Sequence, residues 1–376
     1  MVSKTIDAPA FAGQTAEAHA AAYVFETDVS GELVIREALH EGAQTNYRPS
    51  MVIARTPLWQ YLVETEPGRF QATEVAWDPA HEEWFAVFGE EERNPGEWGH
   101  WKGRGMNWNS MCARCHMTAY VKNYDSLTDR YDSQWTEHGI GCIQCHNIMS
   151  GHEAGGAAMA GIDNFARDPQ RMMHTCASCH SRAESLTAAF VPGEPYDDHF
   201  RLQLPAEPGL YHPDGQILDE VFVFGSFRHS KMHAAGVTCM DCHEPHSGAL
   251  KLPQENNQIC LQCHSSPGRL NAPVIDPTAH SFHQEGSVGN RCVECHMMKT
   301  TYMQRDPRRD HGFIIPDPVL TKELGVPNAC SRCHTDQTLE WNIEHYENWF
   351  GAKRAQSPDR ERALAIDSAY KGDAAA

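Results

Sequence analysis

The chain has 376 residues, of which 41% are hydrophobic and 22% charged, so its composition is that of a folded protein. Lys and Arg number 31 against 50 Asp and Glu, and the formal net charge of −19 argues against nucleic acid or an anionic membrane surface as the main partner. No apolar run reaches the roughly 18 residues that a membrane-spanning helix needs.

The first part of the chain, residues 1–99, contains no cysteine. Residues 1–18 are small and polar and are expected to form a loose arm. From residue 22 to about residue 89, apolar and polar residues alternate in several short runs, separated by turn signals such as Ser30-Gly31 and Pro67-Gly68. This pattern predicts a small antiparallel β subdomain. It is expected to cover the cofactors that follow, or to serve as a docking surface.

Residues 100–340 hold all fourteen cysteines of the chain, arranged as seven C-x-x-C-H motifs with no cysteine left over. The cysteine pairs are Cys112/Cys115, Cys142/Cys145, Cys176/Cys179, Cys239/Cys242, Cys260/Cys263, Cys292/Cys295 and Cys330/Cys333. The histidines that close the motifs are His116, His146, His180, His243, His264, His296 and His334.

The spacing of this motif matches covalent attachment of haem c. Two thiols three positions apart can each form a thioether with one vinyl group, and the next residue, His, becomes the proximal iron ligand. Zinc sites also use C-x-x-C pairs, but they need two pairs for each metal and no trailing His. Disulfides would not require a His after every second Cys. The sequence therefore predicts seven haem c groups, each with one iron.

The region 100–340 is predicted to be a heptahaem domain with little strand. Each haem has only about 34 residues of surrounding chain, which is too few to build an ordinary side-chain core. We therefore expect the porphyrins to form the core, wrapped by short helices and by loops rich in the 28 Gly and 22 Pro of the chain. The predicted fold class is a mainly α, loop-rich multihaem cytochrome c with a small N-terminal β subdomain.

The last part, residues 341–376, is predicted to be a helical tail. Helical character extends from Asp336 to Lys371, with large apolar side chains in its first half, and Gly351 and Pro358 are expected to break the helix.

Sixteen histidines remain after the seven proximal ligands, and some of them are candidates for distal ligands. A second axial His would make an iron six-coordinate and would give a lower potential than a Met/His pair. Four candidates lie close to a motif along the chain, which makes axial ligation easy, and surface or propionate contact is the alternative for each. They are His152, His233, His246 and His283.

Several longer stretches resemble multihaem c-type cytochromes that carry a tetratricopeptide-repeat tail. That group is similar in turn to the superfamily of the ammonia-oxidiser tetrahaem cytochrome, hydroxylamine oxidoreductase and cytochrome c nitrite reductase. The resemblance covers roughly residues 45–350. The matching stretches are 56–64, with the sequence TPLWQYLVE, His100-Trp101, 107–112 (NWNSMC), 210–216 (LYHPDGQ), 230–239 (SKMHAAGVTC), Tyr302-Met303, 306–311 (DPRRDH) and 327–330 (PNAC).

This resemblance implies six distal ligands. They are His152, His212, His233, His246, His283 and His311. The seventh iron is left without one, and His100 and His19 are candidates, beside an open iron or a His from a neighbouring subunit. Members of the group usually carry another haem motif before the β region and continue into helical repeats. The chain is therefore expected to be either a trimmed piece or a divergent seven-haem form.

Three functions follow as hypotheses. The first, and favoured, is electron transfer through closely packed, mostly bis-His haems. The second is reduction of nitrite or oxidation of hydroxylamine at one open haem, and so it stays undecided whether the protein is an enzyme. The third is a subunit of a polymeric extracellular filament. Such an enzyme would need side chains that donate protons and bind an anionic substrate, and the candidates are Tyr302, Arg305, Arg308 and Arg309. The alternative role of these side chains is a salt bridge to a haem propionate.

Covalent haem attachment occurs outside the cytoplasm, so the protein is expected to be periplasmic or extracellular. The sequence from Met1 to Thr5 is not followed by the apolar stretch of an export signal, so the chain is expected to begin at a processed or engineered end, or to lack upstream sequence. The acidic balance predicts a redox partner protein with a basic docking surface. The sequence also allows self-association into an oligomer.

Overall fold

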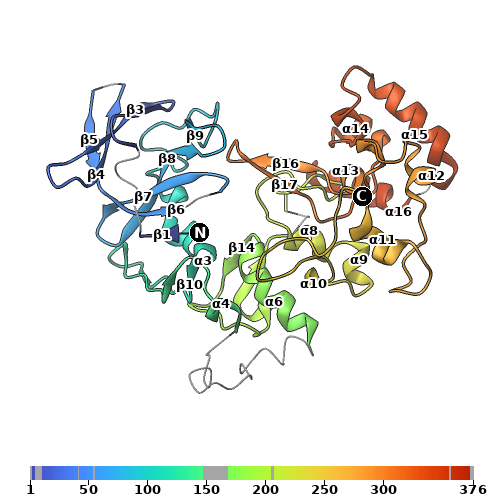
Figure 1. The fold of residues 1–376 in the computed structure, drawn as a ribbon, viewed down its shortest axis with the longest axis horizontal. Helices are drawn as coiled ribbons and strands as arrows, with labels where there is room; N and C mark the ends of the chain where they lie inside the picture. The colour runs from blue at the N-terminus through green and yellow to red at the C-terminus, as the bar shows by residue number, and fades with distance from the viewer. Residues whose placement is uncertain are drawn as a thin grey trace. The chain divides into compact units, whose positions relative to one another are not determined.

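A computed structural model describes residues 2–4, 11–40, 42–53, 56–146, 168–204, 207–354 and 357–372 (Figure 1). Its contacts divide the chain into two compact units. The first unit comprises residues 1–179, 185–200 and 301–306, and the second comprises residues 180–184, 201–300 and 307–376. Among the described residues, no helix is both long enough and apolar enough to cross a membrane.

The first unit contains two antiparallel sheets, which confirm the predicted β subdomain. The four-stranded sheet has the order β2 (Thr15–Glu17), β3 (Ala21–Thr27), β4 (Leu33–Leu39) and β5 (Gln44–Tyr47). The five-stranded sheet has the order β1 (Val2–Ser3), β6 (Pro49–Ile53), β7 (Trp59–Glu66), β8 (Arg69–Asp78) and β9 (Glu83–Ala86).

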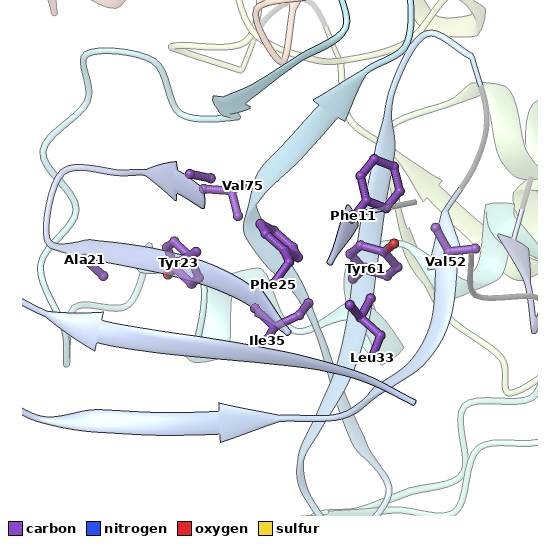
Figure 2. Close-up of a cluster of buried hydrophobic side chains, with 10 residues drawn as sticks. Phe11, Ala21, Tyr23, Phe25, Leu33, Ile35, Val52, Tyr61 and Val75 are labelled. Atoms are coloured by element: carbon purple, nitrogen blue, oxygen red, sulfur yellow. The ribbon is translucent and has the colours of Figure 1, made fainter. Parts of the chain in front are cut away.

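Strict alternation of fully buried and partly buried side chains explains the β3–β4 hairpin. Tyr23 and Phe25 on β3 and Ile35 on β4 are fully buried, and the register pairs Phe25 with Ile35. The connecting turn is closed by Asp28, whose carboxylate accepts hydrogen bonds from the backbone N–H groups of Ser30 (2.8 Å) and Glu32 (3.1 Å). The buried side chains of this hairpin meet those of the second sheet in one apolar cluster (Figure 2).

The expectation of a loose arm over residues 1–18 is wrong for the part of it that the structure describes. Val2 and Ala16 lie on strands, and Phe11 is only 4% exposed. The Phe11 ring packs edge-on against Trp59, Trp77 and Trp84, with centroids 5.6, 5.2 and 5.1 Å apart. A single aromatic residue, buried by a cluster of tryptophans far along the chain, orders this segment.

A buried carboxylate also holds this subdomain together. Glu37, 1% exposed, accepts hydrogen bonds from the phenols of Tyr23 (3.2 Å) and Tyr47 (3.0 Å) and from the Trp101 indole (3.2 Å). The ammonium group of Lys102 lies 2.7 Å from the same carboxylate. A buried charge is tolerated when it is paired and hydrogen-bonded in this way.

Replacing Glu37 with alanine is expected to destabilise the first unit by about 3 kcal/mol, because it leaves several donors buried without their acceptor. The free energy of unfolding, measured by urea denaturation, checks this. Glu26→Ala removes an exposed ion pair with Arg36 and serves as the matched control, with a much smaller loss expected. Equal losses in the two variants would contradict the assigned role of Glu37.

The remaining described elements are short. In the first unit they are η1 (Arg104–Met106), α2 (Trp108–Met111), α3 (Ala113–His116), β10 (Met117–Thr118), β11 (Tyr124–Asp125), β12 (Arg130–Tyr131), β13 (Glu137–His138), α4 (Ile143–His146) and α7 (Tyr196–His199). Several elements carry the chain from one unit to the other, namely α6 (Pro169–His180), β14 (Ala183–Ser185), β15 (Phe200–Leu202), β16 (Lys299–Tyr302) and β17 (Asp306–Arg309).

The second unit is built mainly from single helical turns and loops. Its elements are α8 (Phe224–Arg228), α9 (Lys231–Ala234), α10 (Cys239–Cys242), α11 (Gln258–His264), α12 (Pro277–Ser281), η3 (Val288–Asn290), α13 (Cys292–His296), α14 (Pro318–Leu324), η4 (Cys330–Arg332), α15 (Leu339–Arg354) and α16 (Pro358–Tyr370). It contains a small buried apolar cluster of Leu320, Val326 and Ala363, which fits a unit whose core is completed by cofactors.

Between residues 100 and 340, the described strands form four two-stranded pairs, β10–β13, β11–β12, β14–β15 and β16–β17. Little strand was predicted for this region, and these pairs are two to four residues long. Strands and helices both contribute to the whole fold, so the mainly α description is not confirmed. The boundaries predicted at residues 99/100 and 340/341 stay predictions.

The predicted helical tail forms two helices, α15 and α16. Pro358 occupies the first turn of α16, as its lack of a backbone N–H allows, and the chain leaves the helix before it. Gly351, in contrast, lies inside α15, so the predicted break at this residue is wrong. A glycine inside a helix costs only about 1 kcal/mol, which the contacts of the helix can offset.

Candidate haem sites

All seven C-x-x-C-H motifs lie on helical turns. They are found on or directly around α3, α4, α6, α10, α11, α13 and η4. One helical turn brings residues three positions apart onto the same face, so each pair of thiols points the same way. No disulfide joins any of the fourteen cysteines, all of which lie in the described part of the chain, so each pair is available for thioether formation. The donor set thus fits covalently attached haem.

The β subdomain positions the first motif. Asn109 on α2 accepts a hydrogen bond from the backbone N–H of Phe70 (2.8 Å) and donates one to the carbonyl of Gly68 (3.0 Å). Asn107 donates to the carbonyl of Phe70 (3.2 Å). Because α2 leads directly into Cys112, the start of β8 determines where the first motif lies.

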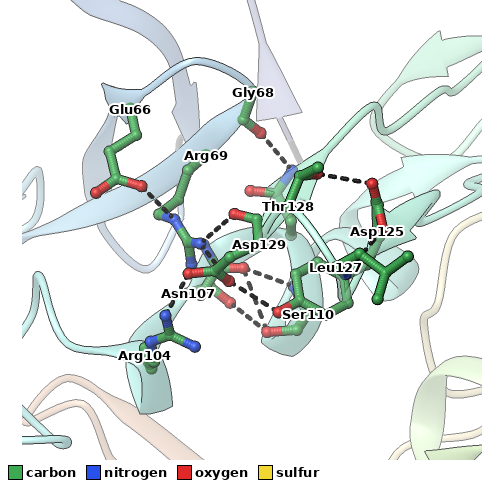
Figure 3. Close-up of polar contacts among 12 residues, drawn as sticks. Glu66, Gly68, Arg69, Arg104, Asn107, Ser110, Asp125, Leu127, Thr128 and Asp129 are labelled. Atoms are coloured by element: carbon green, nitrogen blue, oxygen red, sulfur yellow. Dashed lines mark hydrogen bonds and ion pairs between the residues drawn. The ribbon is translucent and has the colours of Figure 1, made fainter.

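Ion pairs beside the start of β8 hold the β11–β12 hairpin, which follows the first motif in the chain (Figure 3). The Arg69 guanidinium lies 3.2 Å from Glu66 and 2.9 Å from Asp129, and Arg104 also pairs with Asp129. Hydrogen bonds from Tyr124 and the two arginines lower the pKa of Asp129, against the raising effect of its partial desolvation. Asp129 therefore stays ionised and links β8, η1 and the β11–β12 hairpin around the first motif.

In the second unit, consecutive motifs lie in direct contact. The amide of Gln262, between Cys260 and Cys263, donates to the carbonyl of Asp241, between Cys239 and Cys242 (3.2 Å). Arg269 bridges the same two motifs, since it bonds to Gln262 (3.1 Å) and to Asp241 (2.7 Å).

The fifth and sixth motifs are also close to each other, and so are the sixth and seventh. The side chains of Cys260 and Cys292 lie close enough to perturb each other, and the backbone N–H of Cys292 donates to Oδ1 of Asn257 (2.8 Å), directly before α11. The side chain of Cys295 in turn lies near those of Cys330 and Cys333 of the seventh motif. The fourth to seventh motifs therefore follow one another in space in the order of the chain.

Three pairs of imidazole rings in this unit have the spacing of axial ligands. The ring centroids of His243 and His311 are 6.2 Å apart, those of His280 and His296 6.1 Å, and those of His283 and His334 6.1 Å. An iron–nitrogen bond of about 2 Å on each side of an iron would separate two axial imidazole centres by about 6 Å. In each pair, one ring is the proximal His of a motif.

Backbone carbonyls set the tautomer of several of these rings. Nδ1 lies 2.9 Å from the carbonyl oxygen of Arg309 in His311, 2.6 Å from that of Ser281 in His283, and 2.9 Å from that of Ile314 in His296. A carbonyl oxygen can only accept, so Nδ1 carries the proton and the lone pair of Nε2 remains for a metal. Burial lowers the pKa of His311 to about 4, which keeps this ring neutral as ligation requires.

The other predicted distal ligands are placed differently. His212 is half-buried in a turn, and its backbone N–H donates to the carbonyl of Gln216 (2.8 Å). His233 lies on α9, where its ring is 5.4 Å from that of Phe227. His246 is exposed, and its ring lies 3.1 Å from the Glu244 carboxylate. For these three the ligand role stays a prediction, and His152 lies outside the described residues.

The two candidates for the seventh ligand lie in the first unit. His19 is exposed in the turn between β2 and β3. His100 is 1% exposed, its Nδ1 accepts a hydrogen bond from the backbone N–H of Lys102 (3.2 Å), and its Nε2 has no hydrogen-bond partner among the described residues. This arrangement puts the proton on Nε2, the opposite tautomer to that of the paired rings, so ligation through Nε2 would require the bond to Lys102 to break.

Sequence reasoning missed His280. It singled out His283 as a distal candidate because this residue lies close to the Cys292 motif along the chain, whereas the structure places His280 beside His296 and His283 beside His334 of the next motif. His280 lies inside α12, whereas His283 follows the helix after its left-handed C-cap Phe282, so the two imidazoles reach different motifs.

The three arginines considered as anion donors or propionate partners are bonded within the protein. Arg305 lies 2.6 Å from Asp78 and 2.7 Å from Glu83, and Arg308 pairs with Glu220. Arg309 lies 2.7 Å from Glu294 and also donates to two backbone carbonyls. Each of these guanidinium groups thus already has a carboxylate partner within the protein, and their role as donors to an anion or as propionate partners stays a prediction.

Comparison with known proteins gives a consistent result. Residues 219–312 match the class III cytochrome c family, and residues 81–147 match the family of cytochrome c554 and c-prime. Multiheme cytochrome MtrA of Shewanella baltica (strain OS185) is 25% identical over 135 residues, which are 32% of this chain and 34% of that protein. The chain thus spans about a third of the length of this curated relative.

The fold is similar to that in the crystal structure of the outer cell wall cytochrome OcwA. The TM-score is 0.54 at 16% sequence identity, over 81% of this chain and 76% of that chain. Together with the C-x-x-C-H motifs on helical turns, these matches show that the chain is a multihaem c-type cytochrome with covalently bound haem.

Proposed function

We propose that this chain carries seven haem c groups and transfers electrons along them. The observation that carries the proposal is the row of contacting motifs in the second unit, three of which hold imidazole pairs at axial-ligand spacing. The bound haem supplies one-electron chemistry at each iron. The protein supplies two neutral imidazoles for the iron and a short separation between neighbouring motifs.

The proposed axial pairs are His243 with His311, His296 with His280, and His334 with His283. Five of these six imidazoles are held by a helix or by a backbone carbonyl at Nδ1, and His334 follows the turn η4 (Cys330–Arg332). Two imidazoles on one iron leave no face for a substrate, which favours electron transfer over catalysis at these three sites. The remaining predicted distal ligands, His152, His212, His233 and His246, are proposed for the other motifs.

The compartment and the partners belong to the same proposal. Haem c chemistry places the protein in the periplasm or outside the cell, and the net charge of −19 favours a partner with a basic docking face. The wider relationship to hydroxylamine oxidoreductase and nitrite reductases, the tetratricopeptide-repeat group, the nitrite or hydroxylamine activity and the filament all stay predictions.

The haem count tests the proposal directly. The intact mass of the purified holoprotein and its pyridine haemochrome spectrum should both give seven haems per chain. Replacing Cys260 and Cys263 together with serine should lower the count by one, because only one pair of thioethers is lost. A wild-type count below seven, or an unchanged count in this variant, would contradict the assignment of one haem to every motif.

A further inference from the structure

Helix α15 presents an aromatic stripe to the motif at Cys330. Trp341, His345 and Trp349 are spaced four residues apart along the helix, so they lie on one face. The Trp341 and His345 rings are 3.9 Å apart, and those of His345 and Trp349 are 5.9 Å apart. All three rings are half-buried.

The two ends of this stripe contact the two imidazoles of one pair. The Trp341 ring lies 5.0 Å from His334, and the Trp349 ring lies edge-on to His283 at 6.1 Å, with an interplanar angle of 74°. Trp349 is itself held by Phe282, on which it stacks at 4.8 Å with an angle of 6°. Each proposed axial ligand of this iron therefore has one tryptophan against it.

Hydrogen bonds tie the same helix to the motif. Asn342, 1% exposed, donates to the hydroxyl of Ser331 (2.8 Å), which lies between Cys330 and Cys333. Asn328 donates to the same hydroxyl (2.9 Å) and accepts from the backbone N–H of Cys330 (2.8 Å). The helix is thus held in register with the motif, and the aromatic stripe cannot slide along the imidazole pair.

The planes of this pair are also twisted more than those of the other two. The interplanar angle is 39° for His283 and His334, against 29° for His243 and His311 and 20° for His280 and His296. Contact with a neighbouring ring restricts rotation of an imidazole about its bond to a metal. Ligand orientation and burial are among the properties by which a protein tunes a haem iron.

We infer that α15 is part of the haem site at Cys330–His334, where Trp341 and Trp349 act as positioning residues for the two axial imidazoles. They hold the twist between the imidazole planes and shield the iron from water, and so they set the reduction potential of this one haem. The inference rests on the proposed bis-imidazole ligation, and it gives α15, the first helix of the predicted tail, a function beyond that of a tail.

Low-temperature EPR of the oxidised holoprotein tests the inference, because the low-spin ferric spectrum depends on the angle between the axial imidazole planes. Trp341→Leu and Trp349→Leu should each shift the largest g value of one low-spin signal and leave the other signals in place. A spectroscopic redox titration should show one component displaced. Trp341→Phe and Trp349→Phe keep a ring at these positions and should restore both properties towards those of the wild type.

Trp98→Leu is the control, since Trp98 is 71% exposed in the first unit, and it should leave all signals unchanged. Leucine variants with wild-type g values and potentials would overturn the inference, and so would variants that lose haem from the whole protein or shift every signal together. Failure of the proposed function is distinguishable, because it would be seen in the wild type as missing haem or absent low-spin signals.

Discussion

Replacing His280 with alanine is expected to convert one haem from a low-spin to a high-spin ferric state. The proximal His296 would remain, because its Nδ1 is bonded to the carbonyl of Ile314 (2.9 Å). The iron would lose its second imidazole, that of His280, whose ring lies 6.1 Å from the ring of His296. The EPR spectrum of the oxidised protein should gain a high-spin signal equal to one haem, and the reduced protein should bind one equivalent of carbon monoxide.

The assignment of His280 to the Cys292 motif can be checked separately. In a Cys292→Ser/Cys295→Ser background, which lacks that haem, His280→Ala should add no high-spin signal, whereas His283→Ala should still add one. His40→Ala, which changes an exposed His of the first unit, is the control and should leave every haem low-spin. An unchanged spectrum for His280→Ala would show that this iron takes its second ligand from elsewhere.

Replacing Gly289 with alanine is expected to displace the imidazole of His283. A Cβ at residue 289 would lie 2.2 Å from Cδ2 and 2.8 Å from Nε2 of that ring, closer than real Cβ contacts allow. The ring has to move, and its hydrogen bond to the carbonyl of Ser281 and its position opposite His334 move with it. We expect a weakened ligand at the Cys330 motif, seen as a partly high-spin signal and a shifted potential of one haem.

Gly99→Ala is a suitable control for this variant. A Cβ there would meet only the Arg93 side chain, at 3.9 Å, which is an ordinary contact. The control should keep the wild-type spectrum. If Gly289→Ala also kept it, the His283 ring would have room that this structure does not show, and its role as the ligand opposite His334 would be doubtful.

The thioether and proximal residues could be predicted from the sequence, because the chemistry of C-x-x-C-H is local. The distal ligands could not all be predicted, because their placement depends on how loops pack. His243 meets His311, which is 68 residues away, and no local pattern encodes that contact. Closeness to the Cys292 motif along the chain singled out His283 as a candidate, whereas the fold places His280 beside His296.

In the β subdomain, too, locally encoded features could be predicted, and features that depend on distant residues could not. The β3–β4 hairpin was predictable because its buried side chains alternate strictly and Ser30-Gly31 marks the turn. Strand β7 shows no such alternation, since Gln60, Tyr61, Leu62 and Val63 are all buried, and so its pattern alone does not identify it as a strand. The order of Phe11 depends on tryptophans far along the chain, which the composition of the segment around it does not reveal.

The long separation of His243 and His311 also has a consequence for biogenesis. A chain that crosses a membrane with its N-terminus first presents the Cys239–His243 motif well before His311 follows. A haem attached early at this motif would then wait with one face of its iron exposed to solvent and to small oxidants. Closing that face also closes a long loop, at an entropic cost that grows slowly with loop length. Under the proposed His243–His311 ligation, maturation of this site would therefore end only after residue 311 has crossed the membrane.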